Sequence, residues 1–171
     1  MTDTAANPIV DVQTNQGKFA VELWADKAPK TVENFLHYVD EKFYDGTIFH
    51  RVIPGFMIQG GGFSEKMSPK PTAAPIANEA KADVKNVRGS IAMARTSDPH
   101  SATAQFFINT VDNDFLNFTA ANSRGYGYAA FGQVIEGMDV VEKIEKVPTT
   151  RQGGHDDVPA SAVIIQSVTR R

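Results

Sequence analysis

The chain has 171 residues, of which 42% are hydrophobic and 22% are charged, and its formal net charge is −3. This composition is typical of a globular protein, and the negative charge argues against a general nucleic-acid-binding surface. Because the sequence contains no cysteine, disulfide frameworks, zinc–thiolate sites and cysteine nucleophiles are excluded.

The N-terminal segment, residues 1–8, is small and polar, and we expect it to form a flexible tail. It has neither the basic nor the apolar region of a secretory signal. No apolar run in the chain approaches the roughly 18 residues that a membrane span needs. We therefore expect a cytoplasmic, monomeric protein without membrane or nucleic-acid partners, with residues 9–171 forming a single domain.

The pattern of apolar residues predicts strands and helices in alternation along the chain. Period-two alternation predicts a hairpin from residues 9–14 and 18–24 around a turn. Helical spacing from Val32 to Phe43 predicts a helix, with Pro29 at its start and Gly46 just past its end. The remaining strands are expected at 47–53, 57–60, 90–94, 105–109, 129–135 and 162–168, with a second helix at 138–146.

The connections between these elements are loops. A proline-rich surface loop is expected between residues 63 and 88, another loop at 112–127, and a polar loop before the last strand. About eight short strands with close connections predict a mainly antiparallel sheet. We expect a mainly β fold, a closed eight-stranded barrel with the two helices over its open ends. A sandwich would fit the strand count nearly as well.

The hairpin around Pro54-Gly55 carries the most unusual side chains. In a two-residue loop Arg51 would lie opposite Ile58, whereas in a three-residue loop it would lie opposite Gln59. The second register would put Arg51, Gln59 and Met57 on one face, forming a shallow apolar pocket with a cation and an amide at its edge. The sequence does not choose between the two registers.

A second candidate surface lies on the predicted strand at 105–109. Phe106 and Ile108 supply one face, so Phe107 shares the other face with Gln105 and is expected in a binding surface. For Phe115, Leu116 and Tyr128, groove lining and core filling remain equally open.

The other patterns carry less information. The four histidines lack metal-ligand spacing, and the run of three glycines at 60–62 favours a flexible strand exit over a phosphate loop.

Several segments together resemble the cyclophilins, the barrel-fold peptidyl-prolyl cis-trans isomerases, and especially the single-domain bacterial cytoplasmic type. The segments are APKTVENF (28–35), FYDGTIFHRVIPGFMIQGGGF (43–63), NEA (78–80), RGSIAMAR (88–95), SATAQFFI (101–108) and YAAFGQVIEGMDVVEKI (128–144). The resemblance implies isomerisation of Xaa-Pro bonds in proline-containing peptides and folding proteins, without a cofactor or metal. It implies catalytic roles for Arg51, Phe56 and Gln59, and substrate contacts from His50, Met57, Ala94, Arg95, Gln105, Phe107, Phe115, Leu116 and Tyr128.

The chain departs from the family pattern at three of these positions. Arg95 stands where many eukaryotic members have asparagine, Phe115 where they have tryptophan, and Tyr128 where they have histidine. Because the indole N–H is missing at Phe115, the resemblance implies weak binding of cyclosporin. A peptide-binding module without catalysis remains an alternative function. A small-molecule carrier would need a hollow barrel, which large inward residues such as Phe106 and Phe131 oppose.

Overall fold

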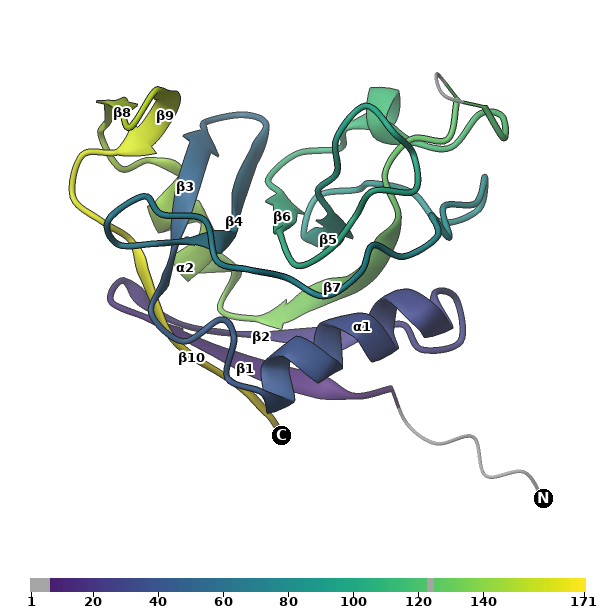
Figure 1. Ribbon diagram of the computed structural model, residues 1–171, viewed down its shortest axis with the longest axis horizontal. Coiled ribbons are helices and arrows are strands. Elements are labelled where there is room, and N and C mark those ends of the chain that lie inside the picture. Colours follow the sequence, from purple (N-terminus) through teal and green to yellow (C-terminus); the bar gives the residue numbers. More distant parts are fainter. Residues whose placement is uncertain (1–6, 123–124) are drawn as a thin grey trace.

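The computed structural model describes residues 7–122 and 125–171, so most of the predicted tail lies outside the described residues. Its main strands are β1 (Ile9–Thr14), β2 (Gly17–Leu23), β3 (Thr47–Ile53), β4 (Met57–Ser64), β5 (Ser90–Met93), β6 (Phe106–Asn109), β7 (Ala130–Glu136) and β10 (Ile164–Arg170). They form a closed antiparallel barrel in the order β1-β10-β3-β4-β6-β5-β7-β2 (Figure 1). The predicted barrel is confirmed over the sandwich.

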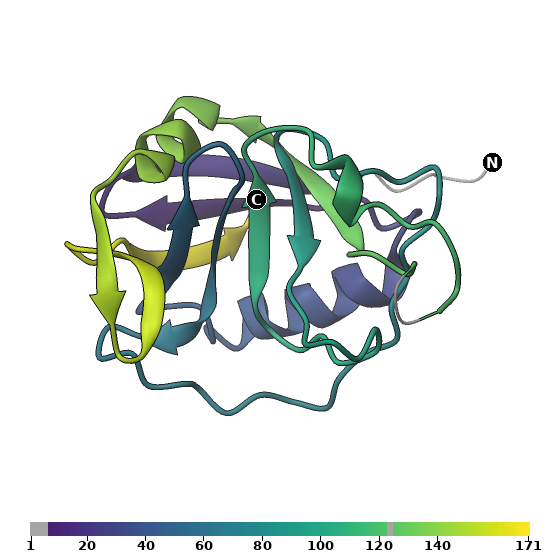
Figure 2. The same ribbon diagram turned by 90° about the horizontal axis from the view of Figure 1, so that it is seen from above.

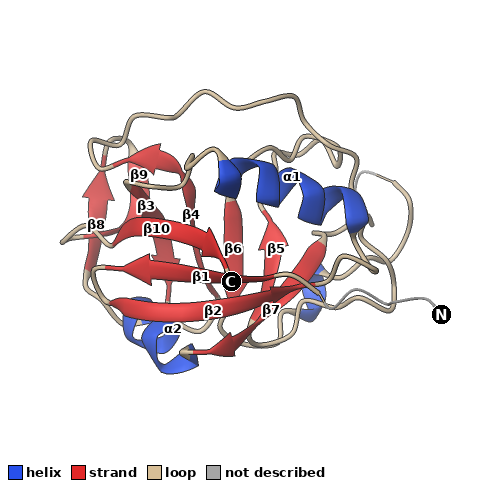
Figure 3. Cartoon of the chain, turned by 90° about the horizontal axis from the view of Figure 1, so that it is seen from below, coloured by secondary structure: helices blue, strands red, loops and turns tan. Residues whose placement is uncertain are grey.

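Two helices lie on opposite sides of this barrel, α1 (Pro29–Asp40) and α2 (Met138–Glu145) (Figures 2 and 3). Helix α1 begins at Pro29, where the missing N–H costs nothing, and buries Val32, Phe35 and Val39 in the barrel core. It ends at Asp40, earlier than the spacing up to Phe43 predicted. The cause is local, because Lys42 adopts a positive φ of 58° and so breaks the helical backbone.

Strand β4 extends four residues beyond its predicted end, through the glycine run. The expectation of a flexible strand exit at 60–62 is therefore wrong. A Cβ atom at Gly60 would lie 2.7 Å from the carbonyl oxygen of Ile48, so glycine permits a close approach of strands β3 and β4. The pairing also slips on either side of Phe49, which marks an irregularity in the β3–β4 ladder at this point.

The predicted polar loop before the last strand contains a small separate sheet, which is a second correction. Strands β8 (Thr149–Gln152) and β9 (His155–Pro159) pair antiparallel across Gly153 and Gly154. Both glycines have positive φ, as a tight two-residue hairpin turn requires. The alternation rule missed the hairpin because none of the residues of β8 is buried. Strand β9 lies against β3 (Figure 1).

The apolar side chains form two separate clusters on the two faces of the barrel wall. The interior cluster includes Phe106, Ile108 and Phe131, so the barrel is filled. A smaller outer cluster contains Met57, Val84, Ala92, Phe107, Leu116 and Ala130. The predicted alternation along β6 is thus confirmed, because Phe106 lies in the interior cluster and Phe107 in the outer one. No helix in the described part of the chain combines the length and apolar character needed to cross a membrane.

Candidate functional site

The β3–β4 hairpin adopts the three-residue turn. Arg51 pairs with Gln59, Val52 with Ile58 and Ile53 with Met57. The turn is closed by a hydrogen bond of 3.1 Å from the Phe56 N–H to the Ile53 carbonyl, and Gly55 takes the positive φ of 74°. This register, one of the two alternatives left open by the sequence, places Arg51 and Gln59 side by side.

The guanidinium of Arg51 is exposed and faces the outer surface of the barrel. Its Nη1 lies 3.5 Å from Oε1 of Gln59, at the limit of a hydrogen bond, and its Cζ lies 6.0 Å from the centre of the Phe56 ring. Among the described residues no carboxylate forms an ion pair with Arg51. The donors of this cation are therefore free to face a ligand.

Strand β6 supplies the opposite wall, because Phe107 is the direct neighbour of Gln59 across the β4–β6 ladder. Its ring is 4% exposed and meets the ring of Tyr128 edge to face at 5.6 Å. Leu116, at the end of a 3-10 turn (Asp114–Leu116), packs in the same outer cluster. The apolar wall therefore comes from segments that lie about fifty or more residues after the hairpin in the sequence.

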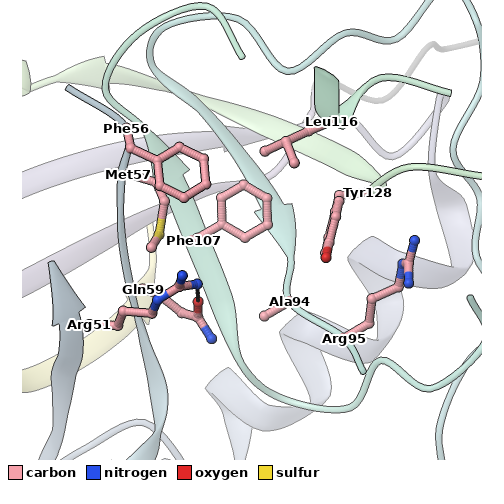
Figure 4. Close-up of a pocket in the computed structure, with 9 residues that line it drawn as sticks. All are labelled: Arg51, Phe56, Met57, Gln59, Ala94, Arg95, Phe107, Leu116 and Tyr128. Carbon is pink, nitrogen blue, oxygen red and sulfur yellow. Dashed lines mark hydrogen bonds between the residues drawn. The ribbon is translucent and has the colours of Figure 1, made fainter. Parts of the chain in front are cut away.

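A single hollow of about 130 Å³ brings these side chains together (Figure 4). Five apolar or aromatic side chains line it, and four polar or small residues complete it: Phe56, Met57, Phe107, Leu116 and Tyr128, with Arg51, Gln59, Ala94 and Arg95. In Figure 4 the two guanidiniums lie on opposite sides of the hollow, and the rings of Phe56 and Phe107 face it from above. The predicted convergence of Arg51, Met57, Gln59 and Phe107 is found here.

The polar edge of the hollow is an ordered chain of hydrogen bonds. Arg51 donates to Oε1 of Gln59, and Nε2 of Gln59 donates to Oε1 of Gln105 at 3.0 Å. Gln105 itself lines a neighbouring hollow and not the first one. The side chain of Gln105 packs closely on Gly62, because a Cβ atom added at Gly62 would lie only 2.3 Å from the Gln105 Cγ. This close packing fixes the position of Gln105. Gln105 therefore orients Gln59 and closes one end of the site.

Two other predicted contact residues lie outside the first hollow. The side chain of Phe115 is 73% exposed and stacks on Phe56 at 5.6 Å, so it extends the apolar rim. His50 is buried on the other side of Arg51, against Phe63 and His155, and lines a separate hollow. Burial, with the nearby His155 and Arg51, lowers the pKa of His50 to about 4, and this histidine is neutral at pH 7.

A buried asparagine network, which was not predicted from the sequence, holds the Phe56 turn. Nδ2 of Asn113 donates to the Phe56 carbonyl at 2.9 Å and to Oδ1 of Asn109 at 2.7 Å. Asn109 in turn donates to Asn86 and to Ser90. In a single sequence, asparagines in loops look like turn formers, so spacing could not reveal this network.

The turn is also held from the side of helix α2. A carboxylate oxygen of Glu145 accepts a hydrogen bond of 2.8 Å from the N–H of Gly55. Nothing in the helical pattern distinguishes Glu145 from any other exposed glutamate. The hairpin that carries Phe56 is thus attached both to the loop after β6 and to the last turn of α2.

Comparison with known proteins adds independent information. The family model described as cyclophilin type peptidyl-prolyl cis-trans isomerase/CLD matches residues 9–170. Peptidyl-prolyl cis-trans isomerase B of Escherichia coli (strain K12) is 59% identical over 161 residues, which cover 94% of this chain and 98% of that protein. Peptidyl-prolyl cis-trans isomerase cyp18 of Streptomyces antibioticus is 57% identical, over 92% of this chain and 95% of that protein.

The barrel also matches solved structures. A crystal structure of a Cryptosporidium parvum cyclophilin type peptidyl-prolyl cis-trans isomerase superimposes with a TM-score of 0.79 at 28% identity, covering 96% of this chain and 98% of that one. The same protein was solved in the presence of the dipeptide Ala-Pro, and that structure gives a TM-score of 0.79, covering 95% of this chain. The similarity in sequence and in fold extends over almost the whole chain.

Proposed function

This chain belongs to the cyclophilin-type peptidyl-prolyl cis-trans isomerases, and from that premise we propose that the hollow between Arg51 and Tyr128 is its active site. The protein is an enzyme that accelerates rotation about Xaa-Pro peptide bonds in proline-containing peptides. The observation that carries the proposal is that Arg51, which forms no ion pair within the described residues, lies at a hollow of about 130 Å³ whose wall is built from apolar and aromatic side chains.

The reaction requires a rotation and not the breaking of a bond. Loss of amide resonance gives a barrier of about 18–20 kcal/mol, and the uncatalysed Xaa-Pro exchange takes about 10–100 s. A catalyst must therefore bind the twisted amide better than either planar form. Lowering the barrier by about 7 kcal/mol would give roughly a 10⁵-fold acceleration.

Arg51 is positioned to stabilise the twisted amide. When the amide twists, the prolyl nitrogen recovers its lone pair and becomes a better hydrogen-bond acceptor. The guanidinium stays protonated, presents several donors in one plane, and has no carboxylate competing for them in the described structure. Its interaction with the nitrogen is strong only in the twisted state, which is the condition for raising kcat.

The apolar side chains and the amides have complementary roles in this proposal. Phe56, Met57, Phe107, Leu116 and Tyr128 hold the proline ring still and exclude water that would stabilise the planar amide. Gln59, fixed between Arg51 and Gln105, holds the substrate backbone. The Ala94 N–H is already donated to the Gln105 carbonyl at 3.0 Å, so an extended peptide would pair with the Ala94 carbonyl and with the backbone of Arg95, beside strand β5.

The proposal is tested by the rate of cis-trans exchange in a blocked proline tetrapeptide, measured with the wild type and with Arg51→Ala. We expect Arg51→Ala to lower kcat/KM by about 10²-fold, as for removal of a preorganised transition-state donor. Arg88→Ala is the matched control, because Arg88 forms only an exposed ion pair with Glu142 at 3.2 Å. Equal rates for wild type and Arg51→Ala would refute the role of Arg51, and peptide binding without faster exchange would favour a non-catalytic binding module.

Five finer expectations remain predictions. Exposed Phe115 at the rim lacks the indole donor, and calorimetric titration should therefore give weak cyclosporin binding. Assistance to folding proteins is tested by the slow refolding phase of a proline-limited client. Analytical ultracentrifugation tests the monomer, and cell fractionation tests the cytoplasmic location. Limited proteolysis tests whether residues 9–171 resist cleavage as one domain.

A further inference from the structure

A second hollow adjoins the proposed proline site and is lined mainly by polar side chains. It has a volume of about 150 Å³ and shares Gln59, Ala94 and Arg95 with the first hollow. The residues that line only the second hollow are all polar: Thr96, Ser101, Thr103 and Gln105. A peptide whose proline occupies the first hollow would therefore pass a neighbouring side chain over the second.

The hydrogen-bond chain along the edge of the site presents a donor to this second hollow. Gln59 donates to Oε1 of Gln105, so the amide of Gln105 is oriented with its Nε2 as the remaining donor. No described residue accepts a hydrogen bond from that Nε2, and Gln105 lines the hollow. The hydrogen bonds thus run in one direction from Arg51 through Gln59 to Gln105. They end at the NH₂ group of Gln105, which has a hydrogen left to donate.

Arg95 presents a positive charge between the two hollows. Its Nε donates to the Gly127 carbonyl at 3.0 Å and its Nη1 to the Thr96 carbonyl at 2.8 Å. Its Cζ lies 4.5 Å from the centre of the Tyr128 ring. These contacts hold the guanidinium in one place without neutralising it, because neutral carbonyls accept its bonds. A ligand anion would meet a cation whose side-chain entropy has already been lost.

Asp98, the acidic residue closest in sequence to Thr96 and Ser101, forms hydrogen bonds within its own loop. Oδ1 of Asp98 accepts the N–H of His100 at 2.9 Å, and the carbonyl of Asp98 accepts the hydroxyl of Ser101 at 2.6 Å. His100 accepts at Nδ1 the N–H of Asn78, and its ring meets that of Tyr126 edge to face, outside the hollow. Asp98 does not line either hollow, so neither carries a carboxylate from the described residues to oppose an incoming anion.

We propose that the second hollow receives an acidic side chain, glutamate or aspartate, that lies a few residues from the substrate proline, and that Arg95 determines this preference. The proposal rests on the proposed function, since it assumes that the proline occupies the first hollow. A carboxylate there would accept hydrogen bonds from Nε2 of Gln105 and from the free edge of the Arg95 guanidinium. The proposed substrates are thus acidic proline-containing segments.

The test compares matched peptides that differ in one residue. Blocked proline peptides carry glutamate at each of the three positions before and after the proline in turn, and each is compared with its glutamine counterpart. We expect one position at which kcat/KM for the glutamate peptide exceeds that for the glutamine peptide about fivefold, the scale of a partly exposed charged pair. In about 1 M salt this preference should shrink toward unity, because the Debye length falls to about 3 Å.

Arg95→Gln should reduce the glutamate-to-glutamine ratio to about one. Because the ratio compares two peptides on the same protein, any general loss of activity cancels. Arg88→Gln removes the same charge away from both hollows and should leave the fivefold ratio unchanged. If Arg95→Gln fails to fold, two other measurements test the proposal. One is the salt series on the wild type, and the other is the glutamate-to-glutamine ratio of Arg95→Lys, which should keep part of the preference.

The outcomes separate this inference from the proposed function. If the folded wild type does not isomerise even the glutamine peptides, the proposed function is refuted. If it isomerises glutamate and glutamine peptides equally at every position, only the preference for acidic residues is refuted. A glutamate preference that persists in Arg95→Gln would also overturn the role of Arg95 and would point to Arg51 as its source.

Discussion

Truncation of Asn113 should damage the proposed proline pocket from a distance. The side chain of this residue is 3% exposed and contacts the pocket only through the backbone of Phe56. Its amide donates to the Phe56 carbonyl and to Oδ1 of Asn109. In Asn113→Ala the two acceptors lose these donors, and the turn that carries the Phe56 ring loses one of its attachments to the loop after β6.

The expected loss of stability follows from what each acceptor retains. The Phe56 carbonyl still accepts the N–H of Thr110 at 3.1 Å, so its second hydrogen bond is worth about 0.5–1.5 kcal/mol. Oδ1 of Asn109 has no other donor among the described residues, and leaving it unsatisfied costs about 1–3 kcal/mol. The free energy of unfolding of Asn113→Ala should therefore fall by about 2–4 kcal/mol. The loosened Phe56 turn should lower kcat/KM by about tenfold.

Denaturant unfolding and the tetrapeptide exchange assay together check this prediction. Asn15→Ala is the matched control, because the Asn15 side chain also makes two hydrogen bonds, to the backbone of Ala162 and Ile164, but in an exposed position. It should lose less than about 1 kcal/mol and keep full activity. Wild-type stability and activity in Asn113→Ala would show that the remaining contacts of the turn, among them the hydrogen bond from Gly55 to Glu145, are sufficient to hold it, and would refute the reasoning.

Three further predictions concern pH, packing and the catalytic cation. The pKa of His50, about 4, lies below its usual value of 6.5, so the unfolded chain binds the proton first. Stability should fall by up to about 3 kcal/mol as the pH drops from 6.5 to 4, and urea unfolding of His50→Gln should show a smaller slope over that range. Gly60→Ala should lower the melting temperature by several degrees, since its Cβ would meet the Ile48 carbonyl; an unchanged value would contradict this. Arg51→Lys should keep the charge but lose the planar donors, giving a kcat/KM about tenfold below wild type and above Arg51→Ala in the tetrapeptide assay.

Most of the fold could be predicted from the sequence because the patterns that indicate its strands and helices are local. Alternation in β1 and β2 and helical spacing in α1 each arise from one buried face, which the period of the apolar residues indicates directly. Strand β6 is buried on both faces, and its alternation separates the barrel core from the outer cluster. The helix end was misjudged because the positive φ of Lys42 has no signature in a non-glycine residue. The β8–β9 hairpin was missed because strands without buried side chains leave no hydrophobic pattern.

The candidate site could be predicted only in part, because its geometry depends on segments that lie far apart in the sequence. The hairpin sequence allowed two registers, and the three-residue turn that makes Arg51 and Gln59 neighbours was one of them. The attachments from Asn113 and Glu145 join segments 57 and 90 residues from the turn. Hydrogen bonds of this kind depend on the closed barrel, so periodicity within one segment cannot reveal them.

The distribution of arginines over the structure connects the proposed catalysis with the proposed specificity. Among the described arginines, Arg88, Arg151, Arg170 and Arg171 each form an ion pair with a carboxylate. Arg51 and Arg95, the two that line the first hollow, do not form one within the described residues. The hollow therefore carries two positive side-chain charges and no carboxylate among the described residues that line it, although the chain as a whole carries a net charge of −3. That arrangement suits an enzyme that must donate to a neutral nitrogen in the transition state and attract acidic peptides to the same place, because a carboxylate paired with either arginine would weaken both effects.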